Sequence, residues 1–210
     1  LGYEAFYIPD DIFAINLEKV RPYLYAIKKS GLIFRCNAHA KYMNDEFAAA
    51  LKDAGCYELS FGIESGSQKI LDNVGKKTSV QQNYDFIKIA KIHDIRIKAY
   101  LMLGLPGEDY KTISETEEFI QKAMGIYGLE DFQLSIYYPY KGTKIRKIMD
   151  RGEDIDLQFL GEGLGAHTHG NGASEARVRT RALSAEDLLR ERTRIIETYK
   201  PRSHMSGWVK

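Results

Sequence analysis

The sequence has few cysteines, no long apolar run and almost no net charge. Its 210 residues include only two cysteines, Cys36 and Cys56, and these do not form a CxxC pair or another metal-ligand spacing. No apolar stretch approaches the roughly 20 residues that span a bilayer. The net charge of +1 offers no electrostatic reason for a nucleic acid or a membrane surface as partner. We therefore expect no nucleic-acid or membrane partner. We also expect a cytoplasmic protein, because so few cysteines suit a reducing compartment.

What the sequence does contain is typical of a folded domain. Hydrophobic residues make up 44% of the chain, and 14 tyrosines and 9 phenylalanines provide material for a core. The first residue is Leu1 rather than methionine, and it stands almost against a strand-like segment. We expect the chain to be a fragment or a processed form of a longer protein.

Strand-like and helix-like segments alternate along the first 150 residues. The apolar patterns predict strands at 5–8, 33–37, 57–62, 96–103 and 132–137, with helices between them. Asn44 and Ser79 stand where helix N-caps are expected. The run from Tyr100 to Leu103 is apolar without alternation, as in strands buried on both faces. The sequence predicts an α/β fold with parallel strands, and both an open doubly wound sheet and a barrel fit the pattern.

The remainder of the chain differs in character. We expect an extension at 151–183, whose part 161–172 holds five glycines and two histidines and reads as a loop. Ser184 is expected to cap a charged C-terminal helix at 184–200, and 201–210 reads as a disordered tail. The pair His167 and His169 has a spacing that metal sites use, but no carboxylate or cysteine supports it, so a plain loop also explains it.

Glycine, proline and polar residues follow every predicted strand. Because ligands collect at the carboxyl ends of parallel strands, these ends are candidate site segments. They are Pro9-Asp10-Asp11, Asn37-Ala38-His39, and the segments 62–67, 104–108 and 138–143.

Each of these segments also has a purely structural explanation. Glu64 and Ser65 offer an acceptor and a hydroxyl for a ribose or an amine, but they could equally begin the short helix predicted at 68–73. The segment 104–108 could be an ordinary strand-to-helix turn, and it lacks the P-loop signature. Asp10 and Asp11 could face a substrate or simply end a strand, and the two cysteines suit small core positions.

Four of these stretches together resemble the radical S-adenosylmethionine (SAM) superfamily, particularly its members with an N-terminal cobalamin-binding domain. They are FRCNAHAKY (34–42), DAGCYELSFGIESGSQKIL (53–71), LMLGLPGED (101–109) and YPYKGT (138–143). The resemblance extends over about residues 5–150. It implies that 1–150 is a radical SAM core, a partial parallel (βα)6 TIM-like barrel that here lacks its first strand and cluster loop and keeps strands 2–6.

The resemblance also implies which residues face ligands. Residues near the SAM would be Asn37, Gly62, Glu64, Ser65, Gly66, Ser67, Gly104, Pro106 and Glu108. Substrate candidates at the other strand ends are Asp10, Asp11, His39 and Tyr138. His39 stands where relatives often have arginine, and Lys141 interrupts the commoner Pro-Gly-Thr run. No residue of this chain is assigned a catalytic or metal-ligating role.

The function implied is that of an enzyme. In the family, a CxxxCxxC loop holds a 4Fe-4S cluster that cleaves SAM to a 5′-deoxyadenosyl radical, for methyl transfer or rearrangement of a small organic substrate. The motif is missing here, so we expect its cysteines upstream and the chain alone to be inactive. The resemblance further implies a flavodoxin or ferredoxin as electron donor, and an upstream cobalamin domain.

Two other functions stay open on the sequence. One is an aldolase-type α/β barrel enzyme with Glu64 or Asp11 in acid–base roles, although no convincing lysine nucleophile or metal set accompanies them. The other is a non-catalytic barrel that binds SAM or a partner. The sequence upstream of Leu1 discriminates between these hypotheses.

Overall fold

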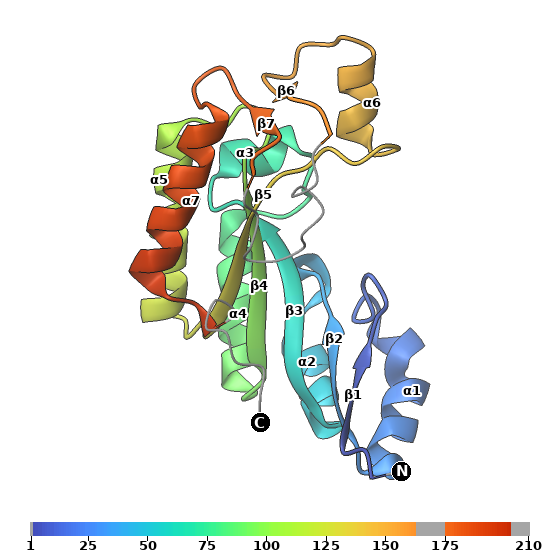
Figure 1. Ribbon diagram of the computed structural model, residues 1–210. Coiled ribbons are helices and arrows are strands. Elements are labelled where there is room, and N and C mark those ends of the chain that lie inside the picture. Colours follow the sequence, from blue (N-terminus) through green and yellow to red (C-terminus); the bar gives the residue numbers. More distant parts are fainter. Residues whose placement is uncertain (1, 163–174, 203–210) are drawn as a thin grey trace. The chain divides into compact units, whose positions relative to one another are not determined.

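The computed structural model describes residues 2–162 and 175–202. Its central element is a five-stranded parallel sheet (Figure 1). The strands are β1 (Ala5–Ile8), β2 (Ile33–Asn37), β3 (Cys56–Glu64), β4 (Arg96–Leu103) and β5 (Asp131–Ile136). They lie in sequential order, and in the described chain the sheet stays open, with β1 and β5 at its edges. A doubly wound sheet would reverse its strand order, so the order is that of a barrel segment.

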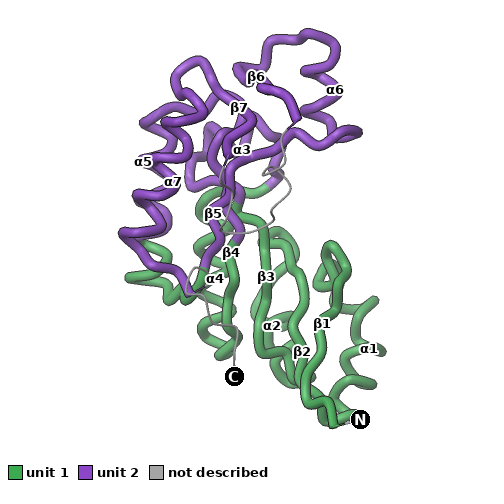
Figure 2. Tube along the Cα trace, in the orientation of Figure 1, with its two compact units in different colours: residues 1–63, 78–99, 122–131 green, residues 64–77, 100–121, 132–210 purple. Residues whose placement is uncertain are grey.

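The chain divides into two compact units, coloured separately in Figure 2. Unit 1 comprises residues 1–63, 78–99 and 122–131. Its helices are α1 (Leu17–Ser30), η1 (Ala40–Tyr42), α2 (Asp45–Asp53) and α4 (Val80–Ile92). α2 packs against both α1 and α4, and α4 also contacts η1. The core of unit 1 includes the buried side chains of Phe34, Leu51, Leu59, Phe61, Phe86 and Ile87.

Unit 2 comprises residues 64–77, 100–121 and 132–210. It contains α3 (Gln68–Asn73), most of α5 (Tyr110–Gly125), α6 (Lys144–Asp150) and α7 (Ala185–Tyr199). α5 and α7 lie side by side, and Arg194 of α7 binds Glu117 of α5 with a shortest N–O distance of 2.7 Å. The core of unit 2 includes Ile70, Leu71, Leu101, Phe119, Phe132, Leu134, Leu188 and Ile195.

Helix starts follow local capping signals. The side chain of Asn44 accepts from the backbone N–H of Phe47 at 2.9 Å, and Ser79 and Ser184 each form a capping box, which confirms these three predicted caps. α6 begins at Lys144, because Thr143 occupies the N-cap position.

One small element, a two-stranded antiparallel sheet, was not predicted from the sequence. β6 (Gln158–Phe159) and β7 (Val178–Arg179) pair as antiparallel strands within the predicted extension. Two residues per strand are too few to show a period of two. Most of the predicted glycine-rich loop, with His167 and His169, lies outside the described residues, as does the tail beyond residue 202. None of the helices that the structure describes is long and apolar enough to cross a membrane.

Candidate functional site

The carboxyl end of β3 has an unusual backbone. Glu64 adopts a left-handed conformation with φ of +66°, which is uncommon for a residue other than glycine. Its carboxylate accepts a hydrogen bond from the ammonium of Lys76 at 2.8 Å, and about a fifth of its side chain is exposed to solvent. A strained backbone conformation persists only where the surrounding structure holds it, and such residues cluster at ligand-binding sites. The end of β3 at Glu64 is therefore a candidate ligand-binding site.

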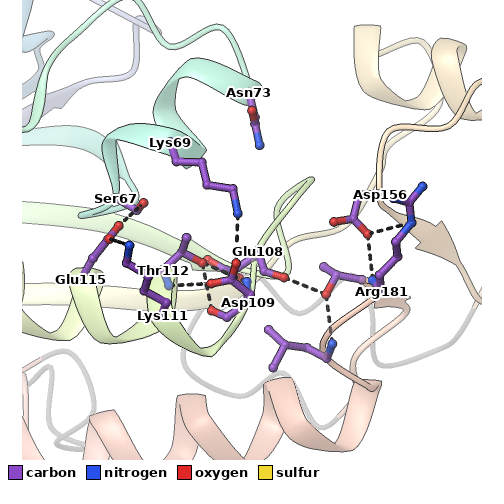
Figure 3. Close-up of polar contacts among 12 residues, drawn as sticks. Ser67, Lys69, Asn73, Glu108, Asp109, Lys111, Thr112, Glu115, Asp156 and Arg181 are labelled. Carbon is purple, nitrogen blue, oxygen red and sulfur yellow. Dashed lines mark hydrogen bonds and ion pairs between the residues drawn. The ribbon is translucent and has the colours of Figure 1, made fainter.

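The next residues are fixed against α5. Thr116 donates its own hydroxyl proton to the carbonyl of Thr112, so its oxygen acts as acceptor for the hydroxyl of Ser65 at 3.0 Å and for the N–H of Gly66 at 3.1 Å. The backbone N–H of Ser67 in turn donates to the hydroxyl oxygen of Ser65. The hydroxyl of Ser67 donates to Glu115 (Figure 3). Ser65 and Ser67 are buried, and both face protein groups.

Gly66 is where the backbone approaches α5 most closely. A Cβ at this position would lie 2.4 Å from Cβ of Phe119 and 2.7 Å from Cα of Thr116. Such distances are well below van der Waals contact, and the second atom belongs to helix backbone. The glycine is therefore required by packing between the strand end and α5.

The turn after β4 encloses a buried carboxyl group. Glu108 has no exposed surface, and one of its oxygens accepts the N–H of Gly104, which itself has φ of +84°. The other oxygen, Oε1, has no hydrogen-bond partner in the described chain. Burial raises the pKa of Glu108 to about 8, with the hydrogen bond from Gly104 opposing the shift. At neutral pH the group is mostly a protonated acid.

Two other contacts in unit 2 hold this turn. The amide of Asn73, at the end of α3, donates to the carbonyl oxygen of Pro106 at 3.0 Å. The hydroxyl of Thr180 donates to the backbone carbonyl of Glu108 at 2.8 Å. A Cβ at Gly104 would meet side-chain atoms of Val178 and Leu188 at 2.9 and 3.1 Å. The 104–108 turn is thus covered by the segment that leads into α7.

Charged residues beside the turn are also paired. Asp109 accepts the N–H of Thr112 at 2.9 Å and the ammonium of Lys69 at 3.0 Å (Figure 3). These partners, the Thr112 N–H foremost, lower the pKa of Asp109, so it stays ionised. The ion pair between Asp109 and Lys69 joins the residue that precedes α5 to α3.

Unit 1 holds a separate group of predicted residues. The side-chain amide of Asn37 donates to the carbonyl oxygen of Asp10 at 2.8 Å and to the hydroxyl of Tyr7 at 3.1 Å, so it fixes the chain after β1. Asp10 and Asp11 are exposed, and His39 caps η1 by accepting the N–H of Lys41. Gly62 lies within β3, two residues before Glu64.

The sequence located these segments but did not identify the residues that organise them. Thr116, Glu115, Asn73 and Thr180 were not predicted, since each lies on another element than the residue it binds. One feature of the sequence points to this contact: Thr112 and Thr116 are polar residues one helical turn apart on the buried face of α5.

The two cysteines do not form a metal centre. Cys36 and Cys56 are both buried, free thiols on neighbouring strands β2 and β3. The contact with Cys56 and burial raise the pKa of the Cys36 thiol, so it stays protonated. Within residues 2–162 and 175–202, no three His, Cys, Asp or Glu side chains gather to hold a metal ion. An iron–sulfur cluster needs several neighbouring thiolates, and these residues do not fit one.

A sheet of parallel strands in sequential order is that of a (βα)-barrel segment. The sequence model of the radical SAM superfamily matches residues 2–120, and the chain belongs to this superfamily. Its members use SAM and a 4Fe-4S cluster. The predicted partial barrel is confirmed at the level of fold.

Three relatives illustrate the similarity. An uncharacterized methyltransferase of Pyrococcus horikoshii is 31% identical over 138 residues, which are 65% of this chain and 29% of that protein. The chain thus spans less than a third of this relative. TsrM from Kitasatospora setae, a radical SAM methyltransferase solved with cobalamin and a 4Fe-4S cluster bound, has a TM-score of 0.61 and 15% identity. That match covers 78% of this chain and 34% of TsrM.

The third relative is OxsB, a cobalamin-dependent SAM radical enzyme solved with aqua-cobalamin bound. It has a TM-score of 0.53 and 16% identity, with 66% of this chain and 21% of OxsB covered. At these identities the solved structures indicate the shared fold.

The residues at the β3 end suit SAM in their chemistry. Glu64 offers a partly exposed carboxylate of the kind that accepts from an ammonium or from ribose hydroxyls. Next to it, backbone and side chains are already satisfied by α5, so Glu64 is the one group of the Glu64–Ser67 segment with an acceptor open to solvent. The carboxylate of Glu64 therefore suits the polar groups of SAM. Cys36 and Cys56 do not suit an iron–sulfur cluster.

Proposed function

We propose that this chain is the SAM-binding back part of a radical SAM enzyme core that acts on a small organic substrate. The observation that carries the proposal is Glu64, a non-glycine residue held at φ of +66° where β3 ends. Backbone strain of this kind clusters at ligand-binding sites. The family match supports the same location, because it includes this strand end.

The residues around Glu64 have distinct parts in this proposal. Glu64 binds the amino group or ribose of SAM, with Lys76 setting its orientation. Ser65, Gly66 and Ser67 act as positioning residues, since they bind α5 rather than solvent. Gly104, Pro106 and Glu108 form the turn after β4 that is proposed to lie beside the bound SAM. Asn37 and Gly62 remain assigned to SAM by resemblance alone.

The cluster is proposed to be held elsewhere in the intact protein, by a CxxxCxxC upstream of Leu1. When bound, the cluster and SAM supply the 5′-deoxyadenosyl radical that family members use. This chain contributes binding, orientation and exclusion of water, and by itself does not cleave SAM. A reducing partner such as a flavodoxin or ferredoxin and a cytoplasmic location belong to the same proposal.

Methyl transfer or rearrangement with cobalamin is the proposed reaction class. One sequence relative is a methyltransferase, and both structural relatives bind cobalamin or depend on it. The cobalamin would be held by a domain outside this chain. The substrate is proposed to be a small molecule, as it is in the TsrM structure solved with tryptophan.

The first experiment reads the coding sequence upstream of Leu1 and expresses the complete protein anaerobically with iron and sulfide. A CxxxCxxC with SAM turnover is expected. In that protein, Glu64→Gln should weaken SAM binding about tenfold, because a charged acceptor is lost, while the iron content stays unchanged. Glu18→Gln, at a site 79% exposed on α1, is the matched control and should leave binding intact.

A natural start at Leu1 without a cysteine triad would refute the enzymatic part. The cysteine-poor chain would then be a barrel that binds SAM or a partner without catalysis. Unchanged SAM affinity in Glu64→Gln would refute the assigned role of Glu64, whichever start is found.

A further inference from the structure

A pocket opens after β5, in the part of unit 2 that the family match does not include. Its volume is about 330 Å³, and it is lined by Tyr138, Tyr140, Lys141 and Glu162. The family model ends at residue 120, so these residues lie beyond what the superfamily has in common. The volume is near the lower end of small-molecule sites and suits a single small ring system.

Aromatic rings form one side of this pocket. The rings of Tyr138 and Tyr140 have centroids 4.8 Å apart at an angle of 60°, and Phe159 meets Tyr138 edge-on at 5.6 Å. The guanidinium of Arg146 already covers Phe159, with its Cζ 4.6 Å from the ring centroid. Tyr140 is 38% exposed, so it is the ring that retains an accessible surface for stacking.

The polar groups of the pocket are of opposite charge. Glu162 accepts the hydroxyl of buried Tyr138, and this hydrogen bond raises the pKa of Tyr138, so the phenol stays a donor to the carboxylate. Lys141 is exposed and has no ion-pair partner in the described chain. Arg146 is paired with Asp150 at 2.8 Å, which leaves Lys141 as the cation of the pocket for a ligand anion.

We propose that this pocket binds a planar heteroaromatic carboxylate: the ring stacks on Tyr140, its N–H donates to Glu162, and its carboxylate pairs with Lys141. In the intact protein such a molecule would be the acceptor substrate, and in this one respect the inference rests on the proposed function. A purely cationic ligand is disfavoured, because the ammonium of Lys141 lines the pocket.

The test measures ligand binding to the 210-residue chain by saturation-transfer NMR and calorimetry, with indole-3-carboxylate as the probe. Saturable binding is expected. Cyclohexanecarboxylate, which lacks both the ring face and the N–H, should bind about tenfold more weakly. Tyr140→Leu should reduce affinity for the probe by a similar factor, while Tyr23→Leu, at an exposed tyrosine of α1, should not change it.

Charge is tested separately. Lys141→Gln should weaken indole-3-carboxylate about fivefold and leave neutral indole unchanged, since only the carboxylate faces the ammonium. Equal affinities for indole-3-carboxylate and cyclohexanecarboxylate, or no saturable binding in a folded chain, would overturn the proposal. SAM binding in the complete protein is an independent measurement, so failure of this pocket leaves the Glu64 assignment standing, and failure at Glu64 leaves the pocket standing.

Discussion

The side-chain amide of Asn73 lies 3.0 Å from the carbonyl oxygen of Pro106 and occupies the space that a Cβ on residue 107 would need, 2.5 Å from Nδ2. The end of α3 and the turn after β4 therefore fit each other only while residue 107 is glycine. The turn lies in one of the four stretches that resemble the radical SAM superfamily, and α3 begins in another.

This fit predicts non-additive substitutions. Gly107→Ala should destabilise the protein by about 2 kcal/mol, through the clash with Asn73 and the positive φ of +80°. In an Asn73→Ala background the clash is absent, and the cost should fall to about 1 kcal/mol. Urea unfolding of the four proteins gives the coupling energy, and strict additivity would contradict the proposed contact.

Gly66 should tolerate no larger residue. Gly66→Ala places a methyl group 2.4 Å from Phe119 and should cost about 3 kcal/mol or prevent folding. Gly125→Ala is the control, because this glycine ends α5 with nothing within 4 Å of its Cβ position. The control should be neutral or slightly stabilising, since alanine favours helix. Thermal unfolding compares the two, and similar midpoints would argue against the close approach.

Thr116 should be needed for its hydroxyl rather than its shape. Thr116→Val leaves the Gly66 N–H and the Ser65 hydroxyl buried without an acceptor, and should cost about 2–3 kcal/mol. Thr116→Ser retains the oxygen and should recover most of that loss. If valine and serine variants unfold at the same urea concentration, the hydrogen bonds contribute nothing measurable.

Glu108 should make stability depend on pH in an unusual direction. Its pKa is about 8 in the folded chain against an ordinary 4.5, so between these values the folded state holds a proton that the unfolded state has lost. This contribution is fully present below pH 4.5 and disappears as pH rises through 8. The contribution amounts to roughly 5 kcal/mol.

Glu108→Gln provides the comparison. The neutral amide retains the shape and cannot ionise, so the variant should gain stability relative to the parent as pH rises from 5 to 8.5. Denaturant midpoints measured at both pH values test this. A difference between the two proteins that stays constant with pH would show that Glu108 ionises normally.

Local features of the sequence predicted the corresponding elements of the fold correctly. The apolar composition of the run 96–103 predicts a buried strand, and Ser79 and Ser184 stand directly before the helices that they cap. The sequential, barrel-like order of the strands depends on contacts between distant residues, so the pattern of elements left it undecided and the structure was needed.

The direction of side chains at the strand ends could not be read from the sequence. Ser65 and Ser67 look like ligand-binding hydroxyls in the linear pattern, yet both bind α5, whose Thr116 is about 50 residues further along the chain. Their proposed contact with SAM was not distinguishable from a packing role until their partners were known. The positive φ of Glu64 could not be predicted either, because glutamate is not a residue type that favours this conformation.

The cover that Val178, Thr180 and Leu188 place over the 104–108 turn has a consequence for biosynthesis. A growing polypeptide finishes β4 and this turn while the covering residues are still some 70 to 80 positions from being made. Until they arrive, the turn lacks the hydrogen bond from Thr180 to the Glu108 carbonyl and the packing of Val178 and Leu188 against Gly104. We therefore expect the turn after β4 to reach its final packing only after α7 has been synthesised, so that this part of unit 2 matures last.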